Sequence, residues 1–129
     1  MSHGPAAGEV ERWQRLAAVA EIPPGGLLFT FMDGPFEEEG ILLRTPDGVR
    51  AWRNLCRHLA VPLDRQRPGD VTDGGGHLVC QEHGARYRAG DGVCVEGPCT
   101  GSRLRPLAVR VEGGQVLLDR SSLGGFFAM

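Results

Sequence analysis

Two short segments of the chain each carry one cysteine and one histidine. The first is Cys56-Arg57-His58, and the second, after 21 intervening residues, is Cys80-Gln81-Glu82-His83. Together they offer two thiolates and two imidazoles, which suit iron, zinc and copper. Because each segment supplies one ligand of each kind, the fold has to bring two separate loops to one metal centre.

The length and composition of the chain favour a single all-β domain. A chain of 129 residues is near the usual size of one domain with one hydrophobic core. Its 20 glycines and 9 prolines are spread along the sequence without a period, which indicates many turns between short strands. No repeat of the kind found in solenoids or propellers is visible.

The charge pattern and the hydropathy exclude several classes of partner. The formal net charge is −2 and the basic residues are scattered, so the basic patch of a nucleic-acid-binding protein is missing. No run of about 18 apolar residues is present, and residues 1–12 are polar, unlike a signal peptide. We therefore expect a soluble, cytoplasmic protein without a membrane partner, whose thiols are kept reduced.

Apolar runs and turn residues predict short antiparallel strands. Residues 13–22 allow either a helix or a strand, which Pro23-Pro24 ends. Thr45-Pro46-Asp47-Gly48 and Glu112-Gly113-Gly114 predict hairpin turns, and the acidic residues 37–39 are expected to form a solvated loop. The expected strands are 27–32, 41–44, 49–52, 78–79, 86–88, 93–95, 107–111 and 116–118.

Several kinds of site could use two cysteines and two histidines. Structural zinc accepts this set, but zinc fingers usually group cysteine with cysteine and histidine with histidine. A catalytic Cys–His pair would leave the second pair unexplained. A mononuclear copper site takes two histidines and one cysteine, which leaves one thiolate over. Chance spacing of surface histidines and core cysteines is the remaining alternative.

The sequence around the two segments resembles the Rieske [2Fe–2S] family and follows its order. The resemblance covers about Trp13 to Asp119 and is strongest between Asn54 and Leu107. The residues that carry it are Asn54-Leu55-Cys56-Arg57-His58, Pro62-Leu63-Asp64, Leu78-Val79-Cys80, His83-Gly84, Tyr87, Gly97-Pro98-Cys99-Thr100-Gly101, Leu104 and Leu107.

The resemblance implies a fold, a domain organisation and a cofactor. The expected fold is a Rieske-type antiparallel β-sandwich base, over residues 13–119, with a smaller cluster-binding subdomain inserted at about 54–106. Residues 1–12 would be a flexible tail and 120–129 an apolar one. One [2Fe–2S] cluster per chain is implied, with one iron bound by Cys56 and Cys80 and the outer iron by His58 and His83, whose neutral imidazoles raise the reduction potential.

Differences from the family pattern point to a non-respiratory, ferredoxin-like subtype. Respiratory members carry an extra cysteine in each ligand loop, joined as a disulfide, and Val61 and Glu82 stand there in this chain. They also carry a serine that bonds to a cluster sulfide, and the residue here is Ala85. Tyr87 either donates its hydroxyl to a cysteine sulfur or is a core aromatic. We expect a potential in the lower half of the Rieske range of roughly −150 to +300 mV.

Four other positions invite comment. Ala60 stands where many members have glycine, at a cost of about 1 kcal/mol if the backbone there is left-handed. Cys94 and Cys99 match no ligand position, so free thiols are expected, with a disulfide as the alternative. His77 is expected to be a surface or core histidine.

The sequence outside the ligand segments shows no catalytic constellation, which favours electron carriage. The expected function is that of a soluble Rieske ferredoxin that passes electrons between a flavin reductase and an oxygenase or other oxidoreductase. An apolar rim for brief docking would consist of Leu59, Ala60, Val61, Pro62, Gly84 and Ala85. Alternatives are a small Rieske subunit of a larger oxidoreductase, with Phe126 and Phe127 at the interface, and a redox-sensing module. An oxygenase catalytic subunit is not expected, because 129 residues leave no room for the mononuclear-iron domain that such enzymes add.

Overall fold

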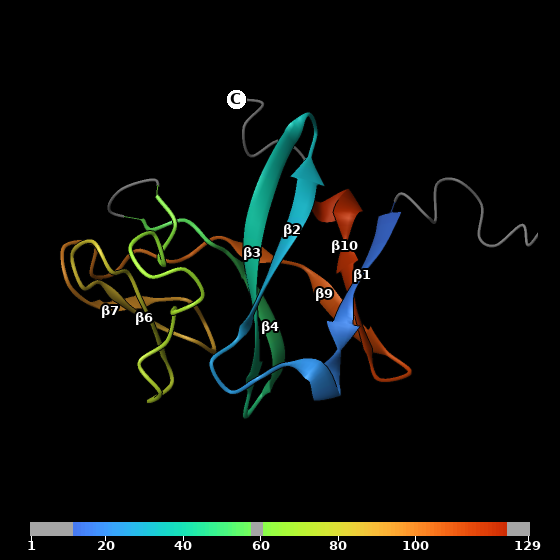
Figure 1. The fold of residues 1–129 in the computed structure, drawn as a ribbon, viewed down its shortest axis with the longest axis horizontal. Coiled ribbons are helices and arrows are strands. Elements are labelled where there is room, and N and C mark those ends of the chain that lie inside the picture. Colours follow the sequence, from blue (N-terminus) through green and yellow to red (C-terminus); the bar gives the residue numbers. More distant parts are fainter. Residues whose placement is uncertain (1–11, 58–60, 124–129) are drawn as a thin grey trace, which may run out of the picture.

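A computed structural model describes residues 12–57 and 61–123 of the chain. The predictions on residues 1–11, on His58, Leu59 and Ala60, and on Phe126 and Phe127 therefore lie outside the described residues. Figure 1 shows three small sheets side by side along the long axis of the molecule. Every pair of neighbouring strands is antiparallel, which confirms the predicted all-β, antiparallel fold.

Two of the sheets form the base. The first has the order β1 (Trp13–Ala18), β10 (Gln115–Asp119), β9 (Val109–Glu112). The second has the order β2 (Leu27–Asp33), β3 (Phe36–Thr45), β4 (Gly48–Arg53), β8 (Pro106–Leu107). Short 3₁₀ turns, η1 (Val19–Glu21) and η2 (Arg120–Ser122), follow β1 and β10. The ambiguous segment 13–22 is thus a strand that ends in a 3₁₀ turn.

The third sheet lies at the other end of the molecule, on the left in Figure 1. It consists of β5 (His77–Val79), β6 (Arg86–Arg88) and β7 (Cys94–Glu96), in that order. All three strands fall within the predicted cluster-binding stretch 54–106. The exact boundaries of that subdomain, and of the domain 13–119, stay predictions.

Strand β3 separates two hydrophobic cores because successive side chains of a strand point to opposite faces. Leu42 belongs to the core of the base, together with Phe31, Val116 and Leu118. The core around the third sheet includes the neighbours of Leu42 on the strand, Ile41 and Leu43, and also Trp52, Leu63, Val71, Leu78, Tyr87 and Leu104. The two cores therefore share one wall, which fixes the third sheet against the base.

Both predicted hairpin turns are present. Thr45 pairs with Gly48 at the end of β3 and β4, where the Thr45 hydroxyl donates to the Gly48 carbonyl at 2.8 Å. Glu112 pairs with Gln115 at the β9–β10 turn. Leu123, just after η2, is buried in the core of the base.

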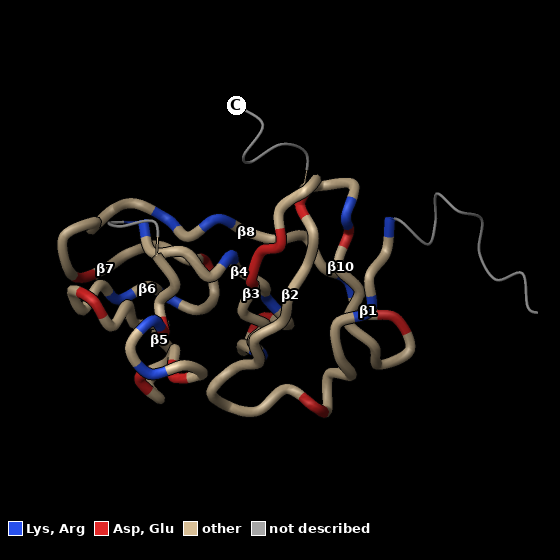
Figure 2. Tube along the Cα trace, turned by 45° about the horizontal axis from the view of Figure 1, so that its top comes forward, with Lys and Arg blue, Asp and Glu red and all other residues tan. Residues whose placement is uncertain are grey.

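The prediction of a solvated acidic loop at residues 37–39 is wrong, because these residues lie in β3. Glu37, Glu38 and Glu39 pair with Met32, Phe31 and Thr30 of β2. Glutamate is disfavoured in strands, but here the continuous pairing of β2 and β3, from Leu27 with Leu42 to Asp33 with Phe36, outweighs that preference. Figure 2 shows the acidic segment of β3 next to β2, at the side of the base that faces the third sheet.

A buried ion pair links β2 to the end of β4. The Arg53 guanidinium donates to the Asp33 carboxylate at 2.8 Å, and both side chains are less than 10 % exposed. The same guanidinium lies over the Phe31 ring, 5.2 Å from its centroid. This contact holds the start of the first ligand segment against the base. Among the described residues, no helix is long and apolar enough to cross a membrane.

Candidate metal centre

The first ligand segment follows β4, and Asn54 bonds both to β3 before the segment and to the residues that come after it. The Asn54 amide donates to the Glu39 carbonyl at 2.9 Å, and its buried side-chain oxygen accepts from the Leu63 amide at 2.9 Å. Its side-chain nitrogen donates to the carboxylates of Glu39 and Asp64, at 2.7 and 2.8 Å. Within the loop the Cys56 amide donates to the Val61 carbonyl at 2.8 Å. A satisfied buried amide of this kind fixes the loop conformation.

The second ligand segment is a tight turn between β5 and β6. The Cys80 amide donates to the Ala85 carbonyl at 2.9 Å, and the Gly84 amide donates to the Cys80 carbonyl at 2.8 Å. Gly84 has φ +71°, which a side chain would disfavour. The Gln81 amide donates to the Leu63 carbonyl at 2.9 Å, so the second ligand segment is bonded to the stretch that follows the first.

The two cysteines predicted to be ligands, Cys56 and Cys80, lie in the core around the third sheet. Cys56 and Cys80 are 4 % and 0 % exposed, and their thiols are within hydrogen-bonding contact. Burial, and after it the contact with Cys56, raise the pKa of the Cys80 thiol to about 11, although the backbone amides of Glu82 and His83, which point at the sulfur, act to lower it. These amides favour a charged sulfur, which is the form that binds a metal.

Tyr87 of β6 places its hydroxyl among several of these groups. The hydroxyl oxygen accepts from the Arg57 amide at 2.9 Å and lies 3.5 Å from Cys56 Sγ. Burial, followed by the contacts with Cys56 and Cys99, raises the pKa of Tyr87, so that the hydroxyl keeps its proton. Tyr87 is also completely buried, so it is both a core aromatic and a neighbour of a ligand sulfur.

The remaining predicted site residues differ in exposure. His83 and Gly84 are exposed at the turn, Pro62 is exposed, and Val61 is half-buried. Ala85 is fully buried, so its expected place in the docking rim is wrong. Its methyl group faces inwards because its carbonyl is needed by the Cys80 amide. Within residues 12–57 and 61–123, no group of three His, Cys, Asp or Glu side chains converges closely enough to hold a metal ion.

His77 takes no part in the ligand segments. Its Nδ1 lies 3.3 Å from the Asp73 carboxylate, and its side chain is about one-third exposed, at 34 %. The Asp73 carboxylate also pairs with Arg86. His77 is therefore a half-buried histidine of the third sheet, in keeping with the expectation.

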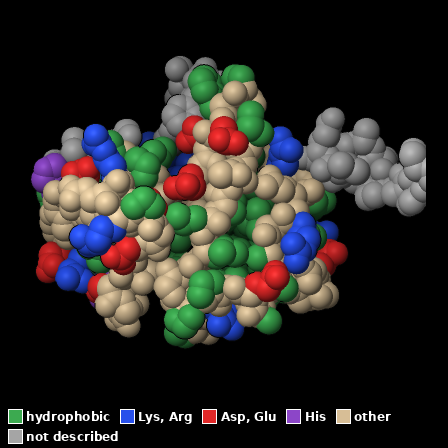
Figure 3. Space-filling view, viewed as in Figure 1, with side chains coloured by type: hydrophobic (Ala, Val, Ile, Leu, Met, Phe, Trp, Pro, Cys, Tyr) green, Lys and Arg blue, Asp and Glu red, His purple; other side chains and the backbone are tan. Residues whose placement is uncertain are grey.

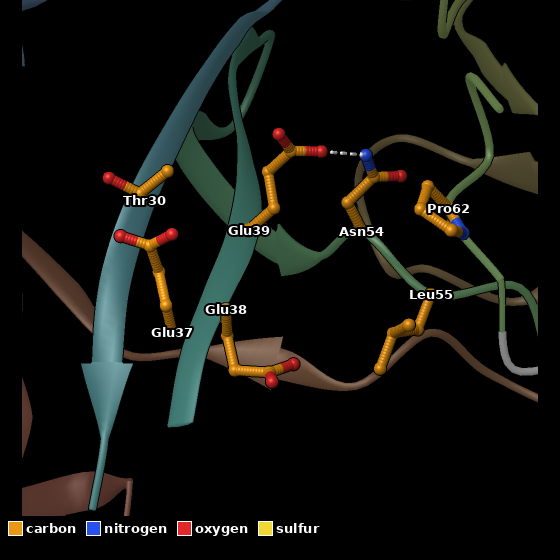
Figure 4. A pocket seen from close by; sticks show the side chains of 7 residues that line it. All are labelled: Thr30, Glu37, Glu38, Glu39, Asn54, Leu55 and Pro62. Carbon is orange, nitrogen blue, oxygen red and sulfur yellow. Dashed lines mark hydrogen bonds between the residues drawn. The ribbon is translucent and has the colours of Figure 1, made fainter. Parts of the chain in front are cut away.

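An acidic pocket of about 280 Å³ adjoins the first ligand segment, and sequence reasoning missed it. Figure 4 shows its lining, in which the glutamates of β3 stand opposite Leu55 and Pro62. The pocket is lined by Thr30, Glu37, Glu38, Glu39, Asn54, Leu55 and Pro62. Burial raises the pKa of Glu38, an effect that Arg53 opposes. The acidic triplet was the only sign of this pocket in the sequence, and its position beside the first ligand segment depends on the pairing of β3 with β2.

A second feature that the sequence did not reveal is a contact between Cys94 and Cys99. Their sulfurs lie 3.2 Å apart, both thiols are free, and Cys99 Sγ is 3.1 Å from the Tyr87 hydroxyl. The expected free thiols are thus present. Two cysteines five residues apart, separated by Gly97-Pro98, were the available signal.

Similar solved structures include both carriers and oxygenases. The ferredoxin of carbazole 1,9a-dioxygenase from Nocardioides aromaticivorans IC177 is 27% identical, with a TM-score of 0.63 over 84% of this chain and 97% of that one. The terminal oxygenase of that system in the same organism is 24% identical, with a TM-score of 0.66 over 84% of this chain. A chain in the reduced complex between oxygenase and ferredoxin in carbazole 1,9a-dioxygenase is 19% identical, with a TM-score of 0.67 over 84% of this chain.

The shares of the matched chains differ. This chain spans 30% of the terminal oxygenase and 28% of the matched chain of the reduced complex. No significant match was found among curated protein sequences. The sequence model of the Rieske [2Fe-2S] domain matches residues 12–118. Because this match takes in both ligand segments and nearly all strands, the chain belongs to the Rieske [2Fe–2S] domain family, and its cofactor is one [2Fe–2S] cluster.

Proposed function

We propose that this chain is a one-electron carrier, a Rieske ferredoxin that passes electrons between a reductase and an oxygenase or other oxidoreductase. The observation that carries the proposal is the pair of buried thiols of Cys56 and Cys80, which interact with each other, together with the exposed His83 three residues after Cys80. When bound, a cluster of this kind accepts and releases one electron. The proposal assigns no catalytic step to the chain.

Cys56 and Cys80 are proposed to hold the inner iron, and His58 and His83 the outer one. The residues fit this group in three respects. The two sulfurs are already together, two backbone amides point at Cys80 Sγ, and the Tyr87 hydroxyl contacts Cys56 Sγ. Each of these donors would stabilise negative charge on the sulfurs, which is how hydrogen bonds tune an iron–sulfur centre.

The partner is proposed to dock on the exposed surface around His83. Pro62, Gly84 and the half-buried Val61 follow the ligand segments in the sequence, and Leu59 and Ala60 belong to the same proposed rim. The acidic pocket on the β3 side would receive basic side chains of the partner. An interface of this size suits brief contacts between redox proteins, and charge complementarity would speed their encounter.

The similarity to a ferredoxin over 97% of that chain's length supports this proposal. The four free thiols favour a reducing compartment, and we propose the cytoplasm.

A matched pair of histidine variants tests the ligand assignment and the function together. The loaded protein should contain equal iron and acid-labile sulfide, and after reduction should show the rhombic electron paramagnetic resonance signal of a mixed-ligand cluster. His83→Gln should abolish that signal, whereas His77→Gln should keep it. Bound zinc, or a signal that survives in His83→Gln, would overturn the ligand assignment. Stopped-flow mixing with a reduced reductase and an oxygenase should show electron transfer much faster than to unrelated acceptors, and equal rates would exclude the carrier function.

One observation favours the alternative of a permanent subunit. Met32 and Phe36, 39 % and 49 % exposed, lie at the end of the β2–β3 hairpin. Figure 3 shows hydrophobic side chains gathered at this tip, at the top of the view. An exposed apolar tip of this kind can pack against another subunit. Size-exclusion chromatography of the chain with its redox partners would separate the two functions, because a permanent subunit would co-elute at low concentration.

A further inference from the structure

We propose that Cys94 and Cys99 form a reversible dithiol–disulfide couple, a thiol-exchange site separate from the cluster ligands, which reacts through Cys99 with small disulfides such as oxidised glutathione. The two sulfurs lie 3.2 Å apart, with Cys99 hydrogen-bonded to Cys94. A disulfide bond measures about 2.05 Å, so closing it needs a movement of about 1.2 Å. A side-chain rotation in a short turn can supply that movement.

The backbone around the pair keeps the two cysteines facing each other. The Cys94 amide donates to the Ser102 carbonyl at 2.7 Å, and the Gly101 amide donates to the Cys94 carbonyl at 2.9 Å. The Ser102 amide and hydroxyl both donate to the Cys99 carbonyl, at 2.9 and 2.6 Å. These bonds close the turn on both sides of the pair, so the approach of the sulfurs does not depend on a chance side-chain position.

The two cysteines differ in access, which assigns them different roles. Cys99 is half-buried, and its neighbours Pro98 and Thr100 are exposed in the turn. Cys94 is 1 % exposed, and its thiol donates to the Glu96 carbonyl at 3.3 Å. A disulfide in solution can therefore reach Cys99 first, while Cys94 can react only with a sulfur that is already bound to Cys99. This division is that of an attacking and a resolving cysteine.

The exchange balances in two steps. The Cys99 thiolate attacks one sulfur of the small disulfide, so that a Cys99 mixed disulfide forms, the original S–S bond breaks and one thiolate leaves. Cys94 then attacks Cys99 Sγ, the mixed S–S bond breaks, and the second thiolate leaves with the proton that Cys94 gives up. The two protein thiols lose two electrons and two protons, and the small disulfide becomes two thiols.

The environment of the couple distinguishes it from the ligand cysteines. Tyr87 stands between them, with its hydroxyl 3.1 Å from Cys99 Sγ and 3.5 Å from Cys56 Sγ. The sulfur contact of the couple runs from Cys99 to Cys94, and the Tyr87 hydroxyl contacts both Cys99 and Cys56. Exchange at Cys99 is therefore proposed to leave Cys56 and Cys80 as cluster ligands.

Peptide mapping of the loaded protein tests the proposal directly. The protein is equilibrated in reduced and oxidised glutathione at a series of ratios, quenched in acid, alkylated and cut with trypsin. Cleavage after Arg88 and Arg103 places Cys94 and Cys99 together in peptide 89–103, whereas Cys56 and Cys80 fall in two other peptides. The expected result is an intramolecular disulfide in peptide 89–103, lighter by two hydrogens, that grows with the oxidised fraction and disappears with dithiothreitol.

Two variants check the assigned roles. Cys94→Ser should accumulate the glutathione adduct at Cys99, because the resolving sulfur is missing, and Cys99→Ser should give no adduct at Cys94. A free dithiol in the wild-type protein at every ratio, a disulfide to Cys56 or Cys80, or an adduct at Cys94 in Cys99→Ser would each overturn the proposal. The wild-type result decides even if a variant fails to fold. Loss of the proposed carrier function would appear separately, as a missing paramagnetic signal with the peptide result unchanged.

Discussion

Replacing Gly97 with alanine would create a steric overlap with the backbone of Ala85, which supports the second ligand segment. Gly97 has φ +104°, and a Cβ there would lie 2.8 Å from Ala85 Cα and 3.3 Å from the Ala85 nitrogen. The left-handed backbone costs an alanine about 1–2 kcal/mol. The overlap adds about 1–3 kcal/mol, because the atoms that must move are backbone rather than a flexible side chain. We expect the free energy of unfolding to fall by about 2–5 kcal/mol in total.

Gly101→Ala provides the matched control in the same turn. Gly101 has φ +92°, and nothing lies within 4 Å of an added Cβ, so only the backbone cost applies. Urea unfolding of the cluster-free proteins should show Gly97→Ala to be less stable than Gly101→Ala by about 1–3 kcal/mol. The Ala85 carbonyl holds the Cys80 amide, so Gly97→Ala should also lose iron to a chelator faster. Equal stability and equal iron loss in the two variants would refute the reasoning.

Three further changes test other contacts. Tyr87→Phe removes the hydroxyl beside Cys56 Sγ. If that contact stabilises the reduced cluster by ~1 kcal/mol, the midpoint potential should fall by ~40 mV in a redox titration. An unchanged midpoint potential would contradict this role of the hydroxyl. Asp33→Ala removes the carboxylate that the buried Arg53 contacts. The free energy of unfolding, measured in urea, should fall by about 3–5 kcal/mol, and a fall below about 1 kcal/mol would contradict the prediction. Backbone amides, chiefly that of Gly75, hold the pKa of Asp73 below its usual 3.8. The ionised Asp73 carboxylate therefore stabilises the folded state fully above pH 3.8, and this contribution is lost as the pH falls through the lower pKa of the folded state. The stability gap between wild type and Asp73→Asn should thus shrink below about pH 4, and a gap independent of pH would speak against it.

The strands and the meeting of Cys56 with Cys80 were predictable because local patterns and a family resemblance both specify them. Val116 and Leu118 lie in an apolar run at residues 116–118, and the turn at residues 45–48 carries its own signal. The acidic triplet was misplaced because its pairing with β2 is a property of two segments together, and glutamate alone indicates a loop.

The polar and sulfur contacts were less predictable for a different reason. Asp33 and Arg53 are 20 residues apart, and Cys94 and Cys99 face each other only because the turn between them folds back. Spacing does not tell whether a turn folds in this way, since the Gly97-Pro98 pair between the two cysteines allows several paths. Ala85 was wrongly assigned to the surface because its position also depends on how a turn folds. Its carbonyl accepts from the Cys80 amide, five positions earlier, and this bond fixes the residue with its methyl group inwards.

The pairing of β1 with β10 also bears on the order in which the chain folds. Arg15 and Gln115 are bonded across a separation of 100 residues, whereas β5, β6 and β7 all lie between residues 77 and 96. Closing a loop ten times longer costs about 2 kcal/mol more in chain entropy, so the local sheet has the easier start. During synthesis β1 must also wait until β10 has left the ribosome. The two ligand segments can therefore approach each other, and be offered to iron, before the first and last strands of the base are joined.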